Sequence, residues 1–365
     1  MDVKTICLVI PSLQSGGMER VMSELANYFC GKREYEIHLI LYGLKREIFY
    51  QVPENIHIHI PDFDFDNNKR TWNTIKTLWF LRQKIKAIQP DTVLSFGELW
   101  NNFVLLANLG LKNPVFVSDR CQPNKSLGKL HDALRKWLYP KAAGVICQTE
   151  LARGIYSKMF SHTNLVVIGN PIRSIEKNPL INKENIILSV GRLIKSKHHD
   201  ELIRIFSKIE AGDWKLIIVG DDALKEKNKE KLASLIQELG LKERVELAGK
   251  RLDVEDFYNK AKIFAFTSSS EGFPNVVGEA MSAGLPVVAY DCVAGPSDLI
   301  EHQKTGYLIK INEVNSFKDA LEKLIKNESL RGTFGYEGKI KIQEFSVTNI
   351  AKQFEKIILN AHTSN

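Results

Sequence analysis

Residues 263–284 read IFAFTSSSEGFPNVVGEAMSAG, and this stretch holds one complete strand–loop–helix unit. The apolar run at 263–267 predicts a buried strand, and the small and apolar residues at 276–283 predict a helix. One acid, Glu271, lies in the loop, and a second, Glu279, lies in the helix. A buried strand followed at once by a helix is the repeating unit of parallel sheets that are covered on both faces. This stretch therefore predicts the α/β class.

The same alternation of strands and helices continues along the whole chain. Expected strands lie at 6–10, 37–42, 56–60, 92–95, 115–118, 144–147, 165–168, 186–190, 215–219, 245–247, 287–290 and 307–309. Expected helices lie at 18–29, 72–88, 127–139, 199–209, 225–239 and 316–325. The series breaks at Asn170-Pro171, before a polar segment. We therefore predict two Rossmann-like, doubly wound domains facing a cleft, at 1–171 and 172–345, and a last helix within 346–365 that returns to the first domain.

The composition limits the function. The chain has 365 residues, about the length of two domains, and a net charge of +7. Within positions 1–172, basic side chains outnumber acidic ones by 21 to 15, so most of the excess charge lies in the first domain. Acids interrupt the basic residues over most of the chain and no recognition motif is present, which argues against binding to nucleic acid. The charge indicates an anionic partner for the first domain.

The cysteines and the apolar runs bear on the compartment. Five scattered cysteines without a CxxC pair indicate reduced thiols and no zinc site. No apolar stretch reaches the length of roughly 18 residues that a membrane-spanning helix needs. The N-terminal stretch MDVKTICLVIPSLQSGG lacks the features of a signal peptide. We expect a cytoplasmic protein without a transmembrane helix.

The first candidate loop follows the expected strand at 6–10 and contains Gly16 and Gly17. Adjacent glycines let a ligand approach the backbone closely, and the start of the following helix offers free N–H groups to an anion. The pattern is not GxGxxG, so it does not favour a nicotinamide cofactor. The alternative is an ordinary tight turn.

The second candidate loop, Gly191-Arg192 with Lys197, follows the expected strand at 186–190. Arginine presents a planar fork to phosphate oxygens, and lysine adds a compact second charge. Two such cations can neutralise a diphosphate without a metal. The alternative is a solvated basic turn.

The third candidate loop is the stretch between Glu271 and Glu279. Glu279 can accept hydrogen bonds from a ribose diol, and Glu271 can reach a sugar hydroxyl. The backbone N–H groups of residues 275–277 are expected to face a phosphate. Simple surface charge is the alternative explanation for two acids, and it fits poorly because their neighbours are of a buried type: Phe273, Pro274, Val276 and Val277.

In this combination the chain resembles the GT-B glycosyltransferases of family 4, the retaining nucleotide-sugar enzymes. Glu271 and Glu279 match the family's pair of acids, and Gly191, Arg192 and Lys197 match its diphosphate motif. Ser15–Arg20 matches its acceptor-side loop, and residues 285–300, LPVVAYDCVAGPSDLI, are also similar. The resemblance covers nearly the whole chain and implies a GT-B fold.

The resemblance also implies roles for individual residues. Arg192 and Lys197 would bind the diphosphate, Glu271 the transferred sugar, Glu279 the ribose, and the backbone around Lys250 the base. The candidate catalytic residues are Glu271, Arg192, Lys197 and Arg120. The whole donor site would comprise Gly16, Gly17, Arg192, Lys197, Lys250, Glu271, Phe273, Pro274, Asn275, Val276, Val277 and Glu279. The base would be uracil, with guanine as the alternative. No metal or other cofactor is implied, and the product would keep the α configuration.

The chain departs from the family at one position. Many members carry a histidine after the fifth strand, where this chain has Arg120. An arginine cannot act as a base near neutral pH, so we expect Arg120 to contact a phosphate or an anionic acceptor. The alternative is a structural ion pair with Asp119 or Glu98. The acceptor-side candidates are Glu19, Glu98, Asp119 and Arg120.

The acidic run 62–66, DFDFD, contains the DxD pattern that binds a metal and a nucleotide in the other glycosyltransferase fold. It lies far in the sequence from the nucleotide motifs. We therefore expect an acidic surface loop.

Two basic segments of the first domain contain tryptophan. Residues 67–90 hold six basic residues and no acid, and residues 125–141 form a second basic series around Trp137. Basic helices with aromatic residues suit an anionic membrane surface. The alternative is an amphipathic helix whose apolar stripe packs on the sheet and whose lysines face water.

The resemblance therefore predicts a retaining enzyme that moves a hexose or N-acetylhexosamine from a nucleotide sugar to a glycan or lipid-linked acceptor in the synthesis of a surface polysaccharide or glycolipid. Two alternatives remain open. One is a nucleotide-sugar epimerase of similar fold, which needs no acceptor. The other is a non-catalytic protein that binds nucleotide sugars.

Overall fold

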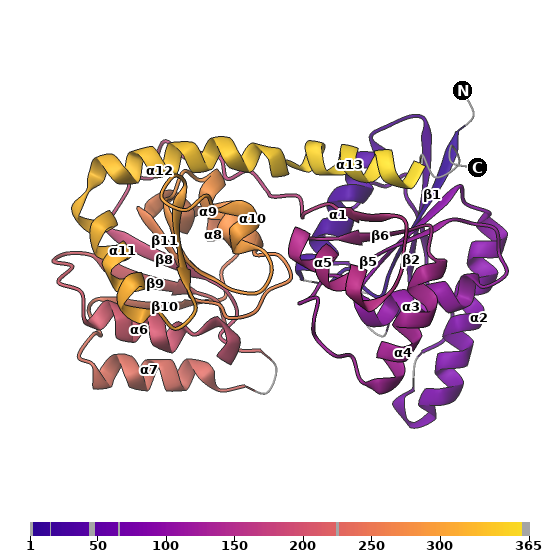
Figure 1. Ribbon diagram of the computed structural model, residues 1–365, viewed down its shortest axis with the longest axis horizontal. Coiled ribbons are helices and arrows are strands. Elements are labelled where there is room, and N and C mark those ends of the chain that lie inside the picture. The colour runs from indigo at the N-terminus through magenta and orange to yellow at the C-terminus, as the bar shows by residue number, and fades with distance from the viewer. Residues whose placement is uncertain (1–2, 15, 44–47, 65, 224–225, 360–365) are drawn as a thin grey trace. The chain divides into compact units, whose positions relative to one another are not determined.

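The computed structural model describes residues 3–14, 16–43, 48–64, 66–223 and 226–359. It divides into two compact units (Figure 1). Unit 1 is Met1–Pro171 together with Val347–Asn365, and unit 2 is Ile172–Ser346. Each unit is an α/β structure around a parallel sheet.

Unit 1 contains seven parallel strands in the order β3-β2-β1-β4-β5-β6-β7. The strands are β1 (Lys4–Ile10), β2 (Tyr35–Leu41), β3 (His57–His59), β4 (Thr92–Phe96), β5 (Val115–Ser118), β6 (Gly144–Cys147) and β7 (Leu165–Val167). The helices are α1 (Gly17–Cys30), α2 (Arg70–Ile88), α3 (Glu98–Asn108), α4 (Lys129–Leu138), α5 (Glu150–Met159) and α13 (Val347–Leu359), with short 3₁₀ turns at Asn67–Lys69 and Tyr139–Lys141.

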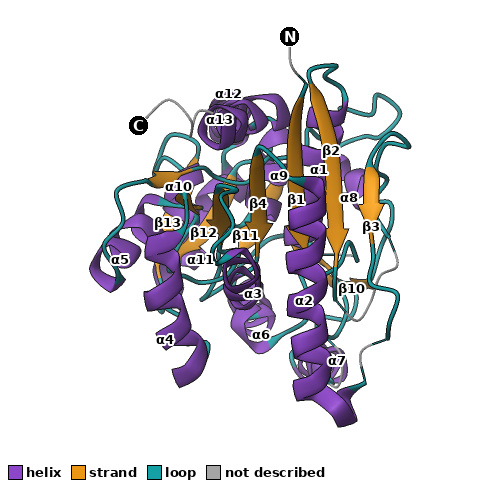
Figure 2. Cartoon of the chain, turned by 90° about the vertical axis from the view of Figure 1, so that its right-hand side faces the viewer, coloured by secondary structure: helices purple, strands orange, loops and turns teal. Residues whose placement is uncertain are grey.

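Helices cover both faces of the sheet of unit 1. On one face α2, α3 and α4 lie side by side (Figure 2). On the other face α13, the yellow helix at the end of the chain, packs on α1 and β4 (Figure 1). The tyrosines Tyr28 and Tyr35 and the ammonium group of Lys32 all donate hydrogen bonds to Glu355 of α13. The last helix is therefore part of the core of the first unit.

Unit 2 contains six parallel strands in the order β10-β9-β8-β11-β12-β13. The strands are β8 (Ile186–Val190), β9 (Lys215–Val219), β10 (Val245–Gly249), β11 (Ile263–Phe266), β12 (Val287–Asp291) and β13 (Gly306–Lys310). The helices are α6 (His199–Ser207), α7 (Asn228–Glu238), α8 (Val254–Lys260), α9 (Asn275–Ser282), α10 (Pro296–Leu299), α11 (Val314–Lys326) and α12 (Glu328–Lys341), with 3₁₀ turns at Lys195–Lys197 and Ile342–Phe345.

In both sheets the strand order reverses beside the first strand of the unit, and we call this place the turning point of the sheet. The first strand of each unit, β1 or β8, has the next strand of the chain on one side and a later strand on the other side. In unit 1 the turning point lies between β1 and β4, and in unit 2 it lies between β8 and β11. Loops at the carboxyl ends of such strand pairs diverge and leave room for a ligand. The fold therefore marks one edge of each sheet as a place for a site.

Candidate functional site

The strongest candidate site lies at the carboxyl edge of unit 2, where β8 and β11 are neighbours. Gly191, Arg192 and Lys197 follow β8, and Glu271 follows β11. The sequence motifs that were predicted to act together are thus brought to the turning point of the sheet. The chain after β9 passes so close to Gly191 that a side chain at Gly220 would collide with the Gly191 carbonyl oxygen.

Hydrogen bonds join the two loops that flank this turning point. The backbone N–H of Ser269 donates to the Ser196 carbonyl oxygen at 2.9 Å, and the Thr267 hydroxyl donates to the Lys197 carbonyl oxygen at 2.9 Å. The imidazole Nε2 of His198 lies 2.9 Å from the Ser269 hydroxyl oxygen. The loops therefore hold each other in position on a rigid sheet.

Lys197 and Glu271 form an ion pair through Nζ and Oε1. Their side chains are only 16% and 14% exposed, and the Lys197 ammonium group lies 5.4 Å from the centroid of the Phe266 ring. The neighbouring Cys292 is buried, and burial together with the Glu271 charge raises the pKa of its thiol to about 12. The pair therefore lies in surroundings that contain little water.

Arg192, in the loop after β8, and His199, the first residue of α6, differ in exposure. Arg192 is exposed, and its side chain forms no hydrogen bond or ion pair with the residues that the structure describes. His199 begins α6 and is 4% exposed, and neither of its ring nitrogens reaches hydrogen-bond geometry within the described part of the chain. Burial lowers the pKa of His199 to about 4. Arg192 is thus available to an anion, whereas His199 is a neutral part of the interior behind the loop.

Glu279 lies in α9 and is 7% exposed. The hydroxyl of Tyr258, a fully buried residue of α8, donates to its Oε2 at 3.0 Å. Lys250 follows β10 and is exposed. The hydrogen bond from Tyr258 therefore orients Glu279, the acid expected to bind a ribose.

The structure corrects one detail of the predicted donor site, its backbone N–H groups, and shows which of its side chains are buried. The side chains of Phe273, Pro274 and Val277 are buried; Phe273 and Val277 belong to the hydrophobic core, and the Phe273 ring centroid lies 5.7 Å from that of Phe345. The N–H groups of Asn275 and Val277 donate to the carbonyl oxygens of Phe273 and Pro274 at 3.0 and 2.9 Å. Those N–H groups are therefore used within the loop, because α9 opens with a tight turn.

At the carboxyl edge of unit 1, Gly16 and Gly17 open α1 after β1. The Tyr50 hydroxyl donates to the Gly16 carbonyl oxygen at 2.9 Å and accepts from the Gly16 N–H at 3.3 Å. The Glu19 side chain folds against Gly16, and burial raises the pKa of its carboxyl group. Ser15, which belongs to the same predicted motif, lies outside the described residues.

Asp119 follows β5 and is 3% exposed. It pairs with Arg135 and accepts hydrogen bonds from Tyr139 at 2.5 Å, Tyr156 at 2.7 Å and Asn101 at 3.0 Å. All of its acceptor capacity is therefore used inside unit 1. This corrects the expectation that Asp119 contacts an acceptor, because a burial this complete leaves the carboxylate no free oxygen.

Arg120, the next residue, is held differently. Its guanidinium carbon lies 3.7 Å from the centroid of Phe96 and 5.7 Å from that of Phe354, and Nη1 donates to Asn170 Oδ1 at 2.6 Å. Nε and Nη2 have no hydrogen-bond partner among the described residues. Burial lowers the pKa of Arg120 to about 9, which leaves it charged at neutral pH. The structural ion pair with Asp119 or Glu98 is therefore not formed, since Asp119 pairs with Arg135.

Glu98, the last acceptor-side candidate, is the first residue of α3 and lies beside Cys121. Burial raises the pKa of the Cys121 thiol, and the charges of Glu98 and Asp119 raise it further. The structure thus places Glu98 next to the loop that carries Arg120.

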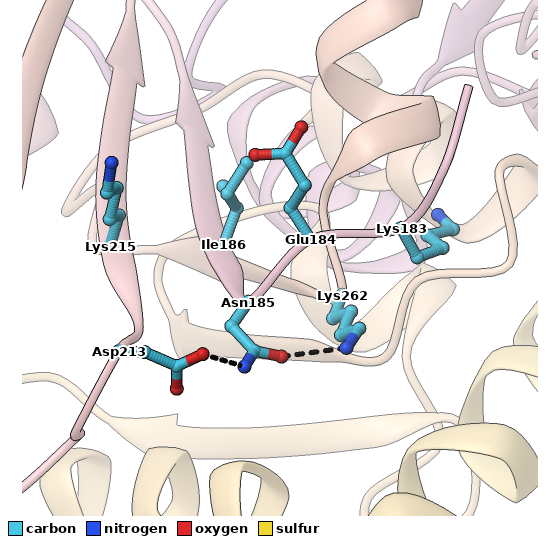
Figure 3. Close-up of a pocket in the computed structure, with 7 residues that line it drawn as sticks. All are labelled: Lys183, Glu184, Asn185, Ile186, Asp213, Lys215 and Lys262. Atoms are coloured by element: carbon cyan, nitrogen blue, oxygen red, sulfur yellow. Dashed lines mark hydrogen bonds between the residues drawn. The ribbon is translucent and has the colours of Figure 1, made fainter.

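A separate pocket lies at the opposite edge of the sheet of unit 2 (Figure 3). It has a volume of about 360 Å³ and is lined by Lys183, Glu184, Asn185, Ile186, Asp213, Lys215 and Lys262. Two of its lysines serve the fold: Lys183 donates to the carbonyl oxygens of Tyr258 and Ala261, and Lys262 donates to Asn185 at 2.7 Å. This pocket lies away from the predicted motifs.

The acidic run at 62–66 behaves as a surface loop where it is described. Asp62, Asp64 and Asp66 are exposed, and Asp66 accepts a hydrogen bond from the Asn68 N–H at 2.9 Å; Phe65 lies outside the described residues. Across the described part of the chain, no three His, Cys, Asp or Glu side chains are placed to hold a metal ion. The described helices include none that is long and apolar enough to span a membrane.

Two helices of unit 1 expose large apolar side chains. Trp72, Ile75 and Trp79 on α2 are 57%, 52% and 65% exposed, and Leu130 and Trp137 on α4 are 70% and 51% exposed. The stripe of α2 that packs on the unit consists of other residues: Asn73, Thr77, Phe80, Leu81 and Ile85. The aromatic residues are therefore not the packed stripe of an amphipathic helix. The prediction that Arg135 belongs to the basic series on the surface is wrong, because Arg135 is buried against Asp119.

Several residues that support the predicted site were not found from the sequence. Tyr258, Tyr50, Asn170 and Phe354 are distant in the sequence from the groups that they contact, and none lies in a motif. A lone tyrosine or asparagine gives no signal of its partner. His198 could have been noticed, since it follows Lys197 directly.

The chain is similar to known proteins over its full length. The model for glycosyl transferases group 1 matches residues 170–341, and the model for glycosyltransferase family 4 matches residues 15–174. The N-acetylgalactosamine-N,N'-diacetylbacillosaminyl-diphospho-undecaprenol 4-alpha-N-acetylgalactosaminyltransferase of Campylobacter jejuni is 30% identical, over 96% of this chain and 98% of that protein. The amylovoran biosynthesis glycosyltransferase AmsD of Erwinia amylovora is 28% identical, over 97% of this chain and 99% of that protein.

A solved structure confirms the predicted fold. Anabaena HepE in complex with UDP matches with a TM-score of 0.80 at 20% identity, covering 97% of this chain and 99% of that one. Two Rossmann-like units with parallel sheets are the GT-B architecture, as the sequence predicts.

Proposed function

This chain belongs to glycosyltransferase family 4, and on that premise we propose that it is a retaining, metal-independent enzyme that transfers a hexose or N-acetylhexosamine from a UDP-linked donor to a lipid-linked or glycan acceptor. The observation that carries the proposal is the meeting of Arg192, Lys197 and Glu271 at the turning point of unit 2. Cations for a diphosphate and an acid for a sugar lie there in the segments that follow two adjacent strands.

The chemistry of each side chain supports a role in binding the donor. Arg192 is exposed and unpaired among the described residues, so its planar fork can take two phosphate oxygens. Lys197, five residues further along the chain in the 3₁₀ turn Lys195–Lys197, adds a second positive charge. Glu279, oriented by Tyr258, accepts from the ribose hydroxyls, and the exposed loop at Lys250 borders the base.

The same cations explain catalysis. Breaking the bond between the sugar and the diphosphate places negative charge on the leaving oxygen. Groups that are already aimed at that charge stabilise the transition state more than the ground state. Arg192 and Lys197 supply this stabilisation as fixed positive charges, so the proposed reaction needs no metal. Glu271 holds the transferred sugar in the site by accepting hydrogen bonds from the sugar hydroxyls.

The acceptor side is proposed to be unit 1. The Campylobacter jejuni relative is named for an acceptor that carries a diphosphate and undecaprenol. An acceptor of that kind presents an anion, and Arg120 carries a positive charge at this edge of unit 1, with Nε and Nη2 buried and without a hydrogen-bond partner among the described residues. Glu19 and Glu98 lie at the same edge of the sheet and are candidates for contacts with acceptor hydroxyls.

We also propose that α2 and α4 contact an anionic membrane surface. Trp72, Trp79 and Trp137 are at least half exposed, and exposed lysines lie among them: Lys69, Lys76, Lys86, Lys129, Lys136 and Lys141. Aromatic side chains enter the headgroup region and lysines attract anionic lipids. This surface would bring a lipid-linked acceptor to unit 1. The function is proposed to serve the assembly of a surface polysaccharide or glycolipid.

The donor is tested with a panel of nucleotide sugars scored by thermal shift and then by product analysis. A ligand that binds the native state raises its stability with concentration over its dissociation constant, so the donor gives the largest shift. Lys197→Ala and Glu279→Ala are expected to abolish transfer while the fold persists by circular dichroism. Wild-type turnover in both variants would refute the site. A changed sugar released without an acceptor would indicate an epimerase, and binding without transfer or hydrolysis a non-catalytic protein.

The membrane surface is tested by co-sedimentation with vesicles of phosphatidylglycerol and phosphatidylcholine and with vesicles of phosphatidylcholine alone. We expect binding to the anionic vesicles, and a loss of at least tenfold in Trp72→Ser/Trp79→Ser. Tyr336→Ser, which removes an exposed aromatic residue of unit 2, is the matched control. Absence of binding to both vesicles would overturn the proposal.

A further inference from the structure

We propose that the Lys197–Glu271 ion pair makes the site discriminate against the nucleoside diphosphate product and in favour of the nucleotide-sugar donor. The inference rests on the proposed function, because it takes Lys197 as a ligand of the diphosphate. In the structure, each of the two groups is the ion-pair partner of the other. A diphosphate that binds Lys197 must therefore compete with Glu271.

The surroundings of the pair make this competition strong. Both side chains are largely buried, and the neighbouring groups are the Phe266 ring and the buried Cys292. A charge in such surroundings is weakly solvated, so separating it from its partner is unfavourable unless another group replaces the partner. If a phosphate replaces Glu271 as the partner of Lys197, the Glu271 carboxylate must accept hydrogen bonds from other donors.

The donor and the product differ in what they offer Glu271. The transferred sugar carries hydroxyl groups, which donate hydrogen bonds and can replace the ammonium group of Lys197. The product lacks the sugar and ends in a phosphate monoester, whose second ionisation lies near pH 6. At neutral pH the product therefore brings one more negative charge and no sugar hydroxyl toward Glu271. The donor therefore gives Glu271 new hydrogen-bond donors in exchange for Lys197, and the product does not.

A neutral residue at position 271 should remove this discrimination. Glu271→Gln keeps the shape of the side chain, frees Lys197 and adds an amide that can donate to a phosphate. We expect the variant to bind UDP at least tenfold more tightly than the wild type by calorimetry at pH 7.5, although it transfers sugar poorly. Glu271→Ala serves the same test if the glutamine variant does not fold.

Two further proteins make the test specific. Glu322→Gln is the matched control, because it neutralises another acid of unit 2 that is paired with a lysine. Glu322 Oε1 lies 3.0 Å from Lys318 Nζ on α11. This variant should leave UDP affinity and turnover unchanged. In a Lys197→Met background, Glu271→Gln should tighten UDP binding much less, because there is no ammonium group to free. The tightening of UDP binding by Glu271→Gln should also be smaller at pH 5.5 than at pH 7.5, because the terminal phosphate of UDP carries less charge at pH 5.5.

The outcomes separate this inference from the proposed function. Impaired transfer with unchanged or weaker UDP binding in Glu271→Gln would overturn the discrimination by the ion pair and leave the donor site intact. The same gain in UDP affinity in the Lys197→Met background would also overturn it, since the effect would not pass through Lys197. Normal transfer in both Glu271→Gln and Lys197→Met would refute the donor site itself.

Discussion

Asp119 in unit 1 and Glu271 in unit 2 are both acids at the carboxyl edge of a parallel sheet, and they are satisfied in opposite ways. Asp119 is held by Arg135, two tyrosines and an asparagine. Glu271 has a single ion-pair partner, Lys197, among the described residues and remains partly exposed. An acid whose acceptor sites are all occupied from within the fold stabilises that fold. An acid with one removable partner is available to a ligand, so position at the edge of a sheet does not by itself identify a binding residue.

Arg120 and Arg135, two of the arginines of unit 1, show the same contrast. Arg135 pairs with Asp119 and contacts the faces of Tyr139 and Tyr156, and of its nitrogens Nε alone is buried without a hydrogen-bond partner among the described residues. Arg120 uses one nitrogen on Asn170 and leaves Nε and Nη2 without a partner in the described structure. If this distinction between satisfied and unsatisfied groups is correct, variants at these positions should separate stability from activity.

The largest effect is expected for Asp119→Asn, which leaves Arg135 buried without its counter-charge. Breaking a buried ion pair by removing one partner costs about 3–5 kcal/mol. We expect a loss of this size in the free energy of unfolding measured with urea. Asp64→Asn, at an exposed position, is the control and should stay within about 0.5 kcal/mol of the wild type. Lost transfer with unchanged stability would instead place Asp119 in the site.

The next effect concerns the imidazole of His199, which has no hydrogen-bond partner in the described structure. Its pKa in the folded state is about 4, below the ordinary value of 6.5, so protonation favours the unfolded chain. Stability should therefore be fully present above about pH 6.5 and fall by up to about 3 kcal/mol as the pH approaches 4. The measurement is urea unfolding across this range. His199→Gln should flatten the curve relative to the wild type, and parallel curves would contradict the assignment.

Arg120→Met tests whether uncommitted donors mark a functional arginine. We expect transfer to fall at least tenfold, while the free energy of unfolding changes by no more than about 1 kcal/mol, since only a ring contact and one hydrogen bond are lost. Arg135→Met is the matched control and should lose about 3–5 kcal/mol. Equal destabilisation by the two variants would remove the distinction between the arginines.

The smallest effect is expected for Tyr258→Phe, which removes one hydrogen bond to Glu279 and keeps the ring. A hydrogen bond to a charged group contributes about 1.5–3 kcal/mol, and part of this loss is expected to appear in binding of the donor. We expect KM for the donor to rise about fivefold with little change in kcat, because Tyr258 orients a group that binds the ribose and does not touch the reacting atoms. A fall in kcat at constant KM would contradict this role.

Local patterns in the sequence predict the fold and the position of the candidate loops after their strands. Each buried strand and each following helix depends on residues that are adjacent in the chain, and the motifs at Gly191–Lys197 and Glu271–Glu279 follow the strands that position them. The partners of those motifs depend on tertiary contacts. Nothing near Asp119 in the sequence indicates that Arg135 and Tyr156 enclose it, and nothing near Glu271 indicates that Lys197 is its partner. The exposure of Trp72 and Trp79 likewise does not follow from the sequence, because two stripes of α2 are candidates for packing.

The membership of α13 in unit 1 has a consequence for the order in which the chain folds. Its residues Phe354 and Glu355 complete the surroundings of Arg120 and Lys32, yet the whole of unit 2 is synthesised before them. During translation, the segment Met1–Pro171 therefore emerges with an uncovered face where α13 will pack. Unit 2 is one continuous segment and can fold once that segment has been synthesised, whereas unit 1 is complete only after α13 has been synthesised. A growing chain should thus gain protease resistance first in its later half.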